Sequence, residues 1–415
     1  MTALLPWEEA RDRVLFRMHP LPALDLPVTE ALGLASAAPV VSPEDMPAFS
    51  NSAVDGFAVR SADIAGASEL TPRRLSVLGH RPAGHSEPIR VGAGETVRIM
   101  TGAPIPEGAD AVVMIEDTDA WDPAAGRSRF GDTHVQVNRP AEAGQHIRPR
   151  GESVQAGAMV LEPGARIRSA EVGLLSALGI RQIRVHPVPR VAVFSSGDEI
   201  VPTEEDPGPG KVRDSNRPAL LAALRHHGFP AIDLGLVPDD EARIADALRR
   251  GARGADFVIS SGGVSVGDRD LTHSVLATLG TALRLKVAMK PGKPQVFGEI
   301  EGVPVYGLPG NPVSSLVVFD VFVLPALRKL AGRKDVLRPS FKARLAGPIQ
   351  RKAGRTEFLR VRLEVEDGGW IARSTGPQGS GILSSMTRAN GYAILPAAVE
   401  GLEAGAPVLC MLWED

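Results

Sequence analysis

The stretch Ser260-Ser261-Gly262-Gly263-Val264-Ser265-Val266-Gly267-Asp268-Arg269-Asp270 decides how this chain is interpreted. It follows the apolar run Asp256–Ile259, which is typical of a buried strand, and precedes Leu271–Leu279, which predicts a helix. A glycine- and serine-rich loop between a strand and a helix can cradle an anion. Glycine lets the backbone approach a ligand, and the helix N-terminus carries partial positive charge. The acids Asp268 and Asp270 at the end of the loop suggest a metal ion beside a phosphate.

Strands and helices are predicted to alternate on both sides of this loop. The other expected strands are Arg190–Phe194, Ala231–Val237, Leu283–Met289 and Val303–Leu308. The other expected helices are Arg217–His227, Asp240–Arg250 and Asn311–Ala331. This alternation predicts a doubly wound, mainly parallel α/β sheet. Because ligands bind beyond the C-terminal strand ends of such sheets, the segments that follow the strands should converge there. These segments are Ser195–Glu199, Asp239, Ser261 and Pro309.

The chain is expected to be a multidomain α/β plus β protein. Its 415 residues are too many for one core, and roughly one domain per 150 residues predicts about three. Segments 1–47 and 141–187 are extended and form a linker domain, and 48–140 is a β-rich insert domain. Residues 188–332 form the α/β domain, and 333–415, which contains only strand patterns, is expected to be a small C-terminal β-barrel.

Composition excludes several classes of protein. Lys+Arg number 46 and Asp+Glu 49, which gives a net charge of −3, and aromatic residues are only 4%. Neither value favours a nucleic-acid or membrane partner. The single cysteine, Cys410, lies in an apolar run and is expected to be buried and inert. Because Met1–Glu9 has acids and no apolar core, no signal peptide is predicted and a cytoplasmic location is expected.

Short motifs along nearly the whole chain together resemble the molybdopterin molybdotransferase family. They are Asn51–Ala58, Arg98–Pro104, Pro106–Val113, Ser196–Glu199, Asp214–Arg217, Ser261–Gly267, Lys290–Pro294 and Leu308–Pro312. The resemblance implies that the substrates are adenylated molybdopterin and molybdate, and that AMP is released with the finished cofactor. It also implies Mg²⁺ as cofactor.

The chemistry of these substrates suggests roles for particular side chains. A pyrophosphate and a molybdate dianion need compact cations, and a divalent metal offsets the remaining charge. Lys286 and Lys290 are placed four apart at one strand end, where they would face the same side, and Lys293 follows. The candidate catalytic residues are Asp55, Thr101, Glu199, Asp270, Lys286 and Lys290. The candidate metal ligands are Asp55, Glu199, Asp239, Asp240, Asp268 and Asp270. The candidate substrate-binding residues are Asp214, Asn216, Ser261, Gly262, Gly263, Ser265, Gly267, Lys293, Pro309, Gly310 and Asn311.

Each candidate also has a purely structural interpretation. The lysines can be solvated surface residues, and the acids surface acids. Asp55 can form a turn before Gly56. Asp214 and Asn216 suit a helix cap near Arg217 better than a nucleotide contact, and Thr101 can belong to a plain strand-end turn. Two positions depart from the family pattern, since Ser153 stands where aspartate is common and Asp268 where glutamate is common.

The resemblance also implies partners. In the family, the segment that carries Asp55 and Thr101 completes the site of the partner subunit, so a homodimer with two composite sites is expected. Molybdopterin adenylyltransferase and the machinery that passes the cofactor to molybdoenzymes are further expected partners. Two alternatives stay open, a molybdopterin adenylyltransferase and a non-catalytic, gephyrin-like scaffold. The β-rich insert and the C-terminal barrel argue against the first, and the complete set of charged site residues argues against the second.

Overall fold

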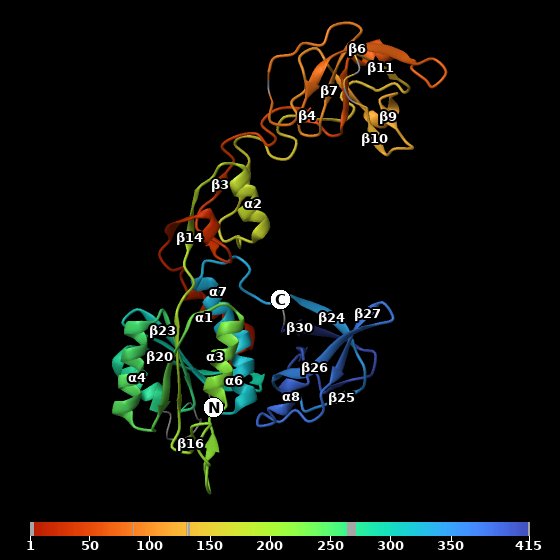
Figure 1. Cartoon of the computed structure of the whole chain (residues 1–415). Coiled ribbons are helices and arrows are strands. Elements are labelled where there is room, and N and C mark those ends of the chain that lie inside the picture. The colour runs from red at the N-terminus through yellow and green to blue at the C-terminus, as the bar shows by residue number, and fades with distance from the viewer. Residues whose placement is uncertain (1–3, 86, 130, 132, 264–270, 414–415) are drawn as a thin grey trace. The chain divides into compact units, whose positions relative to one another are not determined.

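The computed structural model describes residues 4–85, 87–129, 131, 133–263 and 271–413 (Figure 1). The chain forms two compact units, which are described separately. The first unit comprises Met1–Ala38, Pro163–Val172 and Gln182–Asp415. The second comprises Pro39–Glu162 and Gly173–Arg181. Four of the predicted site residues, Ser265, Gly267, Asp268 and Asp270, lie outside the described residues.

A mixed sheet forms the centre of the first unit, with the strand order β18-β15-β19-β23-β22-β20. The parallel strands are β15 (Val191–Ser196), β18 (Ala231–Val237), β19 (Phe257–Ser261) and β23 (Val303–Leu308). Two antiparallel strands, β22 (Pro294–Ile300) and β20 (Thr281–Lys286), extend one side of the sheet. The mainly parallel α/β sheet expected from the sequence is therefore confirmed.

Helices cover both faces of this sheet (Figure 1). Alternate residues of β15 take part in two separate cores, because successive side chains of a strand point to opposite faces. Val191 and Val193 pack with α3, α6 and α7, whereas Ala192 and Phe194 pack with α4 and α5. The helices are α3 (Asn216–His226), α4 (Glu241–Gly254), α5 (Leu271–Leu279), α6 (Pro312–Val318), the π-helical η4 (Phe319–Val323) and α7 (Leu324–Leu330). This two-sided packing is the doubly wound architecture.

The prediction of one strand over Leu283–Met289 is wrong. Strand β20 ends at Lys286, and a separate strand, β21 (Met289–Lys290), pairs with the C-terminal barrel. Between the two strands, Val287 donates a hydrogen bond to the carbonyl of Lys293 and Ala288 donates one to the carbonyl of Leu5. The first bond continues the pairing of β20 with β22 by one residue, and the second joins the chain to the N-terminal segment. Lys286 and Lys290 are therefore not on one strand, and the argument that they face the same side fails.

The C-terminal strands close into the expected barrel. They are β24 (Ser340–Leu345), β26 (Thr356–Glu366), β27 (Gly369–Ser374), β28 (Gly391–Leu395) and β30 (Pro407–Leu412). The ring closes because β26 pairs with both β27 and β28. Cys410 is fully buried in the barrel core, and this burial raises the pKa of its thiol to about 12. The expectation of a buried, inert cysteine agrees with this environment.

Two smaller parts complete the first unit. Helix α1 (Trp7–Phe16) packs against the α/β core and the barrel, with the rings of Trp7 and Phe358 in edge-to-face contact at 5.2 Å between centroids. The extended linker strands β1 (Leu24–Pro27), β14 (Gln182–His186) and β2 (Ala35–Ser36) form an antiparallel sheet. The short pairs in this unit are β16 (Ile200–Val201) with β17 (Val212–Arg213) and β25 (Ile349–Gln350) with β29 (Gly401–Leu402).

The second unit is built around a sheet with the order β11-β6-β7-β5-β8. Its strands are β5 (Gly56–Val59), β6 (Arg73–Arg81), β7 (Glu95–Ile99), β8 (Ala111–Met114) and β11 (His134–Val137). Shorter pairs join β9 (Trp121–Asp122) to β10 (Arg127–Ser128), β12 (Ile147–Arg148) to β4 (Asn51–Ser52) and β13 (Met159–Leu161) to β3 (Val40–Val41). The unit is thus rich in β structure.

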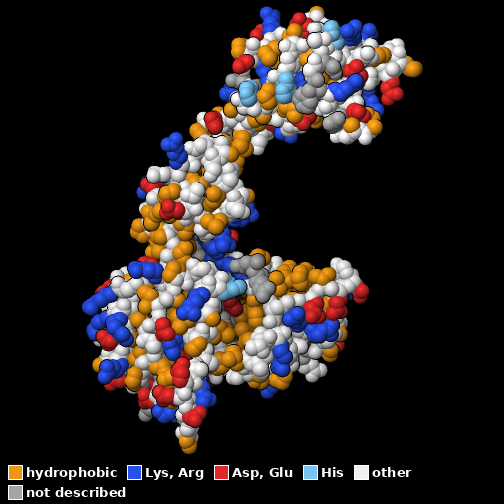
Figure 2. Space-filling view, viewed as in Figure 1, with side chains coloured by type: hydrophobic (Ala, Val, Ile, Leu, Met, Phe, Trp, Pro, Cys, Tyr) orange, Lys and Arg blue, Asp and Glu red, His pale blue; other side chains and the backbone are white. Residues whose placement is uncertain are grey.

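The surface and the helices agree with the charge and hydropathy of the sequence. On the face drawn in Figure 2, basic and acidic side chains are interspersed, in keeping with the near-neutral charge balance. Among the described residues, no helix combines the length and the apolar character needed to cross a membrane.

Candidate active site

A cavity of about 720 Å³ lies at the C-terminal ends of strands β15, β19 and β23. We call it the strand-end cavity. Among its described lining residues are Ser196, Glu199, Asp214, Asn216, Gly262, Gly263, Pro294, Pro309, Gly310 and Asn311. The structure therefore brings together the segments after three parallel strands, as the topology requires. Asp239 is not among these lining residues, and its backbone N–H donates to Asp198 Oδ1 at 3.1 Å.

The two glycines of the loop are required by its geometry. Gly262 has φ +93° and Gly263 has φ +68°, both in the left-handed region that side chains rarely adopt. A Cβ on Gly262 would lie 2.1 Å from the carbonyl oxygen of Ser196. One on Gly263 would lie 2.7 Å from Thr272 Oγ1. Glycine thus lets the loop lie directly against the end of β15 and leaves backbone exposed to the cavity.

Asp214 and Asn216 tie the start of α3 to this loop. The buried carboxylate of Asp214 accepts bonds from Ser195 Oγ at 3.1 Å and from the backbone N–H of Arg217 at 3.2 Å. It also forms an ion pair with Arg217 Nε at 2.9 Å. Burial lowers the pKa of Arg217, but Asp233 and Asp214 outweigh this effect and the pKa is raised. Asp214 therefore caps the helix as expected.

Asn216 does not act as a cap. It is the first residue of α3, and its Nδ2 donates to Ser261 Oγ at 2.8 Å and to the carbonyl of Gly310 at 2.7 Å. The amide therefore connects the ends of β19 and β23 across the floor of the strand-end cavity. The interpretation of Asn216 as a helix cap is wrong, because its donor group is used between strands rather than on the helix backbone.

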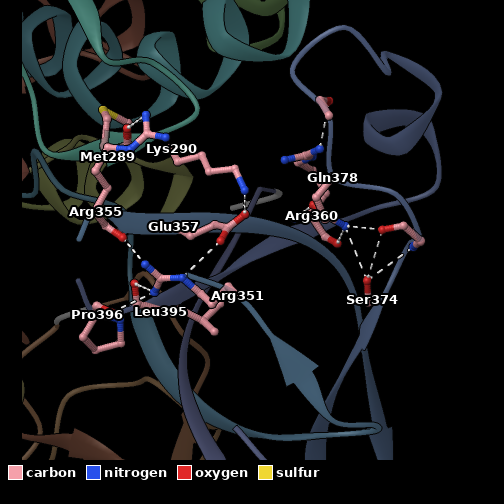
Figure 3. A network of polar contacts seen from close by, with 12 residues as sticks. Met289, Lys290, Arg351, Arg355, Glu357, Arg360, Ser374, Gln378, Leu395 and Pro396 are labelled. Atoms are coloured by element: carbon pink, nitrogen blue, oxygen red, sulfur yellow. Dashed lines mark hydrogen bonds and ion pairs between the residues drawn. The ribbon is translucent and has the colours of Figure 1, made fainter. Parts of the chain in front are cut away.

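A second cavity of about 560 Å³ is rich in cationic side chains, and we call it the cationic cavity. Lys290, Arg351, Lys352 and Arg355 line it together with a single carboxylate among the described residues, Glu357. Lys290 Nζ lies 2.9 Å from Glu357 Oε1, and Arg351 Nε lies 3.3 Å from Glu357 Oε2 (Figure 3). Four positive groups against one negative group give the cavity a preference for anions.

One short segment borders both cavities. Lys290 lines the cationic cavity, and Pro294, four residues later, lines the strand-end cavity. Lys293, between them, is partly buried. Lys286 is exposed at the end of β20, opposite Pro294, and is not among the described lining residues of either cavity. Of the three predicted lysines, Lys290 therefore has the clearest anion environment.

Asp55 and Thr101 belong to the second unit and contact one another. Asp55 Oδ1 accepts hydrogen bonds from the backbone N–H of Thr101 at 2.7 Å and from its hydroxyl at 2.8 Å. Both residues are exposed. The pairing joins two motifs that are far apart in the sequence, and it holds the Asp55 carboxylate in a fixed orientation.

The described residues do not by themselves form a metal centre. Among them, no group of three or more His, Cys, Asp or Glu side chains is placed to hold an ion. Glu199 lines the strand-end cavity and is exposed, whereas Asp240 caps α4 by accepting from the backbone N–H of Arg243 at 2.9 Å. Two further expected ligands, Asp268 and Asp270, lie outside the described residues. The described donors alone therefore do not fit Mg²⁺.

Sequence reasoning missed most of the cationic cavity. Arg351, Lys352, Arg355, Glu357 and Gln378 were not predicted as site residues. A usable signal was present, because three cations stand together in Arg351–Arg355 directly before the strand that begins at Thr356. Only the pairing of β21 with β26 shows that this cluster adjoins Lys290.

Comparisons with known proteins identify the family. Family models match three successive parts of the chain. They are described as the MoeA N-terminal region (domains I and II) over residues 5–179, a probable molybdopterin-binding domain over 192–329 and the MoeA C-terminal region (domain IV) over 342–413. The chain is 37% identical to molybdopterin molybdenumtransferase 2 of Mycobacterium tuberculosis over 398 residues, which cover 94% of this chain and 95% of the relative. The chain belongs to the molybdopterin molybdenumtransferase family.

Other members of the molybdopterin molybdenumtransferase family agree over the full length. The Haemophilus influenzae molybdopterin molybdenumtransferase is 37% identical and covers 98% of each chain. The crystal structure of the molybdopterin biosynthesis MoeA protein of Pyrococcus horikoshii matches with a TM-score of 0.82 at 31% identity, over 99% of this chain and 100% of that one. The resemblance predicted from the motifs is therefore confirmed, and with it the assignment as a transferase of molybdenum cofactor biosynthesis.

Proposed function

We propose that this chain transfers molybdenum from molybdate to adenylated molybdopterin and releases AMP. The nucleotide substrate would occupy the strand-end cavity, and molybdate the cationic cavity. The observation that carries this assignment is the segment Lys290–Pro294, which lines the cationic cavity at one end and the strand-end cavity at the other. Two anionic substrates bound on either side of one short segment would lie next to each other.

The strand-end cavity suits a nucleotide with a phosphoanhydride. Gly262, Gly263 and Gly310 expose backbone along its wall, so phosphate oxygens can approach main-chain groups closely. Asn216 fixes the position of this wall through Ser261 and Gly310. The cavity volume lies within the range usual for small-molecule sites.

The cationic cavity suits a compact oxyanion. Lys290 is about half exposed, with 47% of its side chain accessible, so its ammonium can reach a ligand in the cavity. Lys352 is exposed and Arg355 is partly buried. Arg355 donates one bond, from Nη1 to the carbonyl of Met289 at 3.4 Å. Because this acceptor is neutral, the bond leaves the positive charge of the guanidinium available to the cavity.

The proposed chemistry needs no covalent enzyme intermediate. An oxygen of molybdate or of water attacks a phosphorus of the substrate phosphoanhydride. A new P–O bond forms, the bridging P–O bond breaks, and AMP leaves. Lys290 and the neighbouring cations stabilise the negative charge that develops on the oxygens. The two dithiolene thiols of the substrate then form Mo–S bonds, and one oxo group of molybdate leaves as water with the two thiol protons, while the protein holds both reactants in position.

A requirement for Mg²⁺ remains a prediction. Two described acids line the strand-end cavity, Glu199 and Asp214. Asp214 caps α3, so Glu199 is the candidate ligand, and Asp268 and Asp270 would have to supply further ligands. Removal of divalent metal by a chelator should abolish AMP release, and Mg²⁺ should restore it. Activity that persists after exhaustive chelation would show that the cations of the protein suffice.

We also propose that the active form is a homodimer with composite sites. In this arrangement Asp55, oriented by Thr101, serves the site of the partner subunit, and Lys290 serves its own. Asp55→Ala and Lys290→Ala subunits should then complement each other, because a mixed dimer retains one intact site. Absence of recovery after verified subunit exchange would refute the composite site. Molybdopterin adenylyltransferase and the cofactor-acceptor machinery are the proposed partners before and after this reaction.

A single-turnover assay tests the function. Purified chain, adenylated molybdopterin and molybdate should yield AMP, and Lys290→Ala should require more molybdate for the same rate. Lys342→Ala, an exposed lysine of β24 in the same barrel, is the matched control and should behave as wild type. Consumption of ATP with molybdopterin would instead support an adenylyltransferase. The absence of both reactions would support a scaffold.

A further inference from the structure

Glu357 occupies an unusual position in the cationic cavity. It is the only carboxylate among the described lining residues, and just 5% of its side chain is accessible. Its Oε1 lies 2.9 Å from Lys290 Nζ, and its Oε2 lies 3.3 Å from Arg351 Nε. Figure 3 shows the carboxylate between the two cations. The Glu357 carboxylate therefore already pairs with the ammonium group of Lys290, which binds molybdate in the proposed function.

The backbone holds Glu357 opposite Lys290. Strands β21 and β26 pair in parallel, with Met289 opposite Thr356 and Lys290 opposite Glu357. The backbone N–H of Thr356 also donates to the carbonyl of Ala288 at 2.9 Å. Because both partners are fixed by this pairing, their contact does not depend on the chance orientation of two surface side chains.

Arg351 anchors the carboxylate from the other side. Its side chain is 5% accessible, and its guanidinium donates to the carbonyls of Pro396 at 2.8 Å, Leu395 at 3.3 Å and Arg355. These bonds leave Arg351 little freedom to turn toward a ligand. Lys290, at 47% accessibility, is the movable member of the group. An anion that enters the cavity must therefore share the ammonium of Lys290 with Glu357.

We infer that Glu357 sets the affinity of the cationic cavity for oxyanions by competing for Lys290. In the empty cavity the carboxylate pairs with the ammonium. When a dianion binds there, the two negative groups lie near one cation and repel each other, which weakens binding. The cavity thus holds molybdate loosely enough to pass it to the neighbouring substrate. This inference rests on the proposed function, because it takes the cationic cavity as the molybdate site.

Isothermal titration calorimetry of the full chain with inorganic molybdate tests the inference. Glu357→Gln keeps the size of the side chain and removes its charge. It should tighten molybdate binding by about tenfold, as expected for removing one unit charge a few ångströms from a bound anion in a partly solvated site. Glu364→Gln is the matched control, since this carboxylate lies on the same strand in an exposed ion pair with Arg362. It should leave the affinity unchanged.

A double-mutant cycle tests whether the effect of Glu357 on molybdate binding depends on Lys290. Lys290→Met should weaken molybdate binding, and Glu357→Gln should bring little gain in that background. If Lys290→Met binds as wild type, the proposed molybdate site is wrong. If Lys290→Met weakens binding but Glu357→Gln weakens it too, the site stands and Glu357 only positions Lys290. A gain that is equally large without Lys290 would also overturn competition for the ammonium.

A second variant guards against misfolding. Glu357→Asp keeps a negative charge beside Arg351 but shortens the reach to Lys290, so it should show part of the gain at an unchanged melting temperature. In the AMP-release assay, the KM for molybdate should fall in both variants. A purely structural residue would instead lower the melting temperature without improving the KM. Unchanged or weaker binding in both folded variants would refute the inference.

Discussion

Replacement of Gly262 by alanine tests the geometry of the strand-end cavity most directly. The added methyl group would lie 2.1 Å from the carbonyl oxygen of Ser196, and the residue would keep φ +93°. Its own N–H donates to the carbonyl of Leu308 at 3.1 Å, so the loop cannot move without straining the end of β23. The perturbation therefore acts on three strand ends at once.

The expected cost has two parts. A non-glycine residue in the left-handed region costs roughly 1–2 kcal/mol. Forcing an extra methyl group into a packed site costs about 1–3 kcal/mol more. Gly262→Ala should therefore lower the free energy of unfolding by about 3 kcal/mol and weaken AMP binding strongly. Gly310→Ala is the matched control, because its Cβ would meet nothing closer than the Cα of Gly262 at 3.8 Å. It should stay within about 0.5 kcal/mol of wild type.

Urea titration followed by far-UV circular dichroism measures the stability of both variants, and calorimetric titration with AMP measures binding. The two glycines line the same cavity, so a difference between them isolates the backbone clash from the mere addition of a methyl group. The reasoning is refuted if Gly262→Ala unfolds within about 1 kcal/mol of Gly310→Ala. Equal AMP affinity in the two variants would refute it as well.

Three further predictions concern stability and reactivity. Tyr392→Phe removes the donor to the buried carboxylate of Asp320, a bond of 2.8 Å, and should cost about 2 kcal/mol in urea titrations. Tyr306→Phe, which loses a bond to the neutral Gln295, should cost about half as much. Hydrogen bonds from Arg168 lower the pKa of Glu171 from 4.5 to about 2, so this carboxylate contributes stability above pH 4.5 and loses it as the pH falls toward 2. The difference in melting temperature between wild type and Glu171→Gln should shrink over that interval, and a constant difference would contradict the assignment. Cys410, with a pKa of about 12, should resist thiol reagents at pH 8 in the folded protein and react once urea unfolds it.

Elements with a strong local period were predictable. The helix Leu271–Leu279 and the strand Val303–Leu308 coincide with α5 and β23, because each has its own apolar pattern and a clear start or stop. Strand β22 (Pro294–Ile300) was not predicted, since Pro294 and Gly298 are residue types that weaken the local signal of a strand. The expected strand Leu283–Met289 was wrong because the chain leaves the sheet to pair with another domain. Such a pairing is a tertiary event with no local signal.

The site was predictable where one motif supplies it. The strand-end cavity collects the glycines and the Pro309-Gly310-Asn311 turn as the strand order requires. Asn216 was assigned to the wrong task, because a residue that opens a helix and one that bridges two strands look alike in sequence. The cationic cavity could not be assembled from Lys290 alone. Its other members come from the barrel, and their proximity follows from the register between β21 and β26.

The pairing of β21 with β26 also bears on aggregation. Glu357 pairs with Leu395 on one edge of β26 and with Lys290 on the other, while β27 takes over that second edge only from Val361 onward. On this second edge, between Glu357 and Val361, Gln378 bonds the backbone of Arg360. Its Oε1 accepts from the Arg360 N–H, and its Nε2 donates to the Arg360 carbonyl. A proteolytic fragment containing the barrel without β21 would expose the backbone of Thr356 and Glu357 as an open strand edge. Such edges recruit strands from other molecules, so the isolated barrel should self-associate through this edge, which β21 covers in the whole chain.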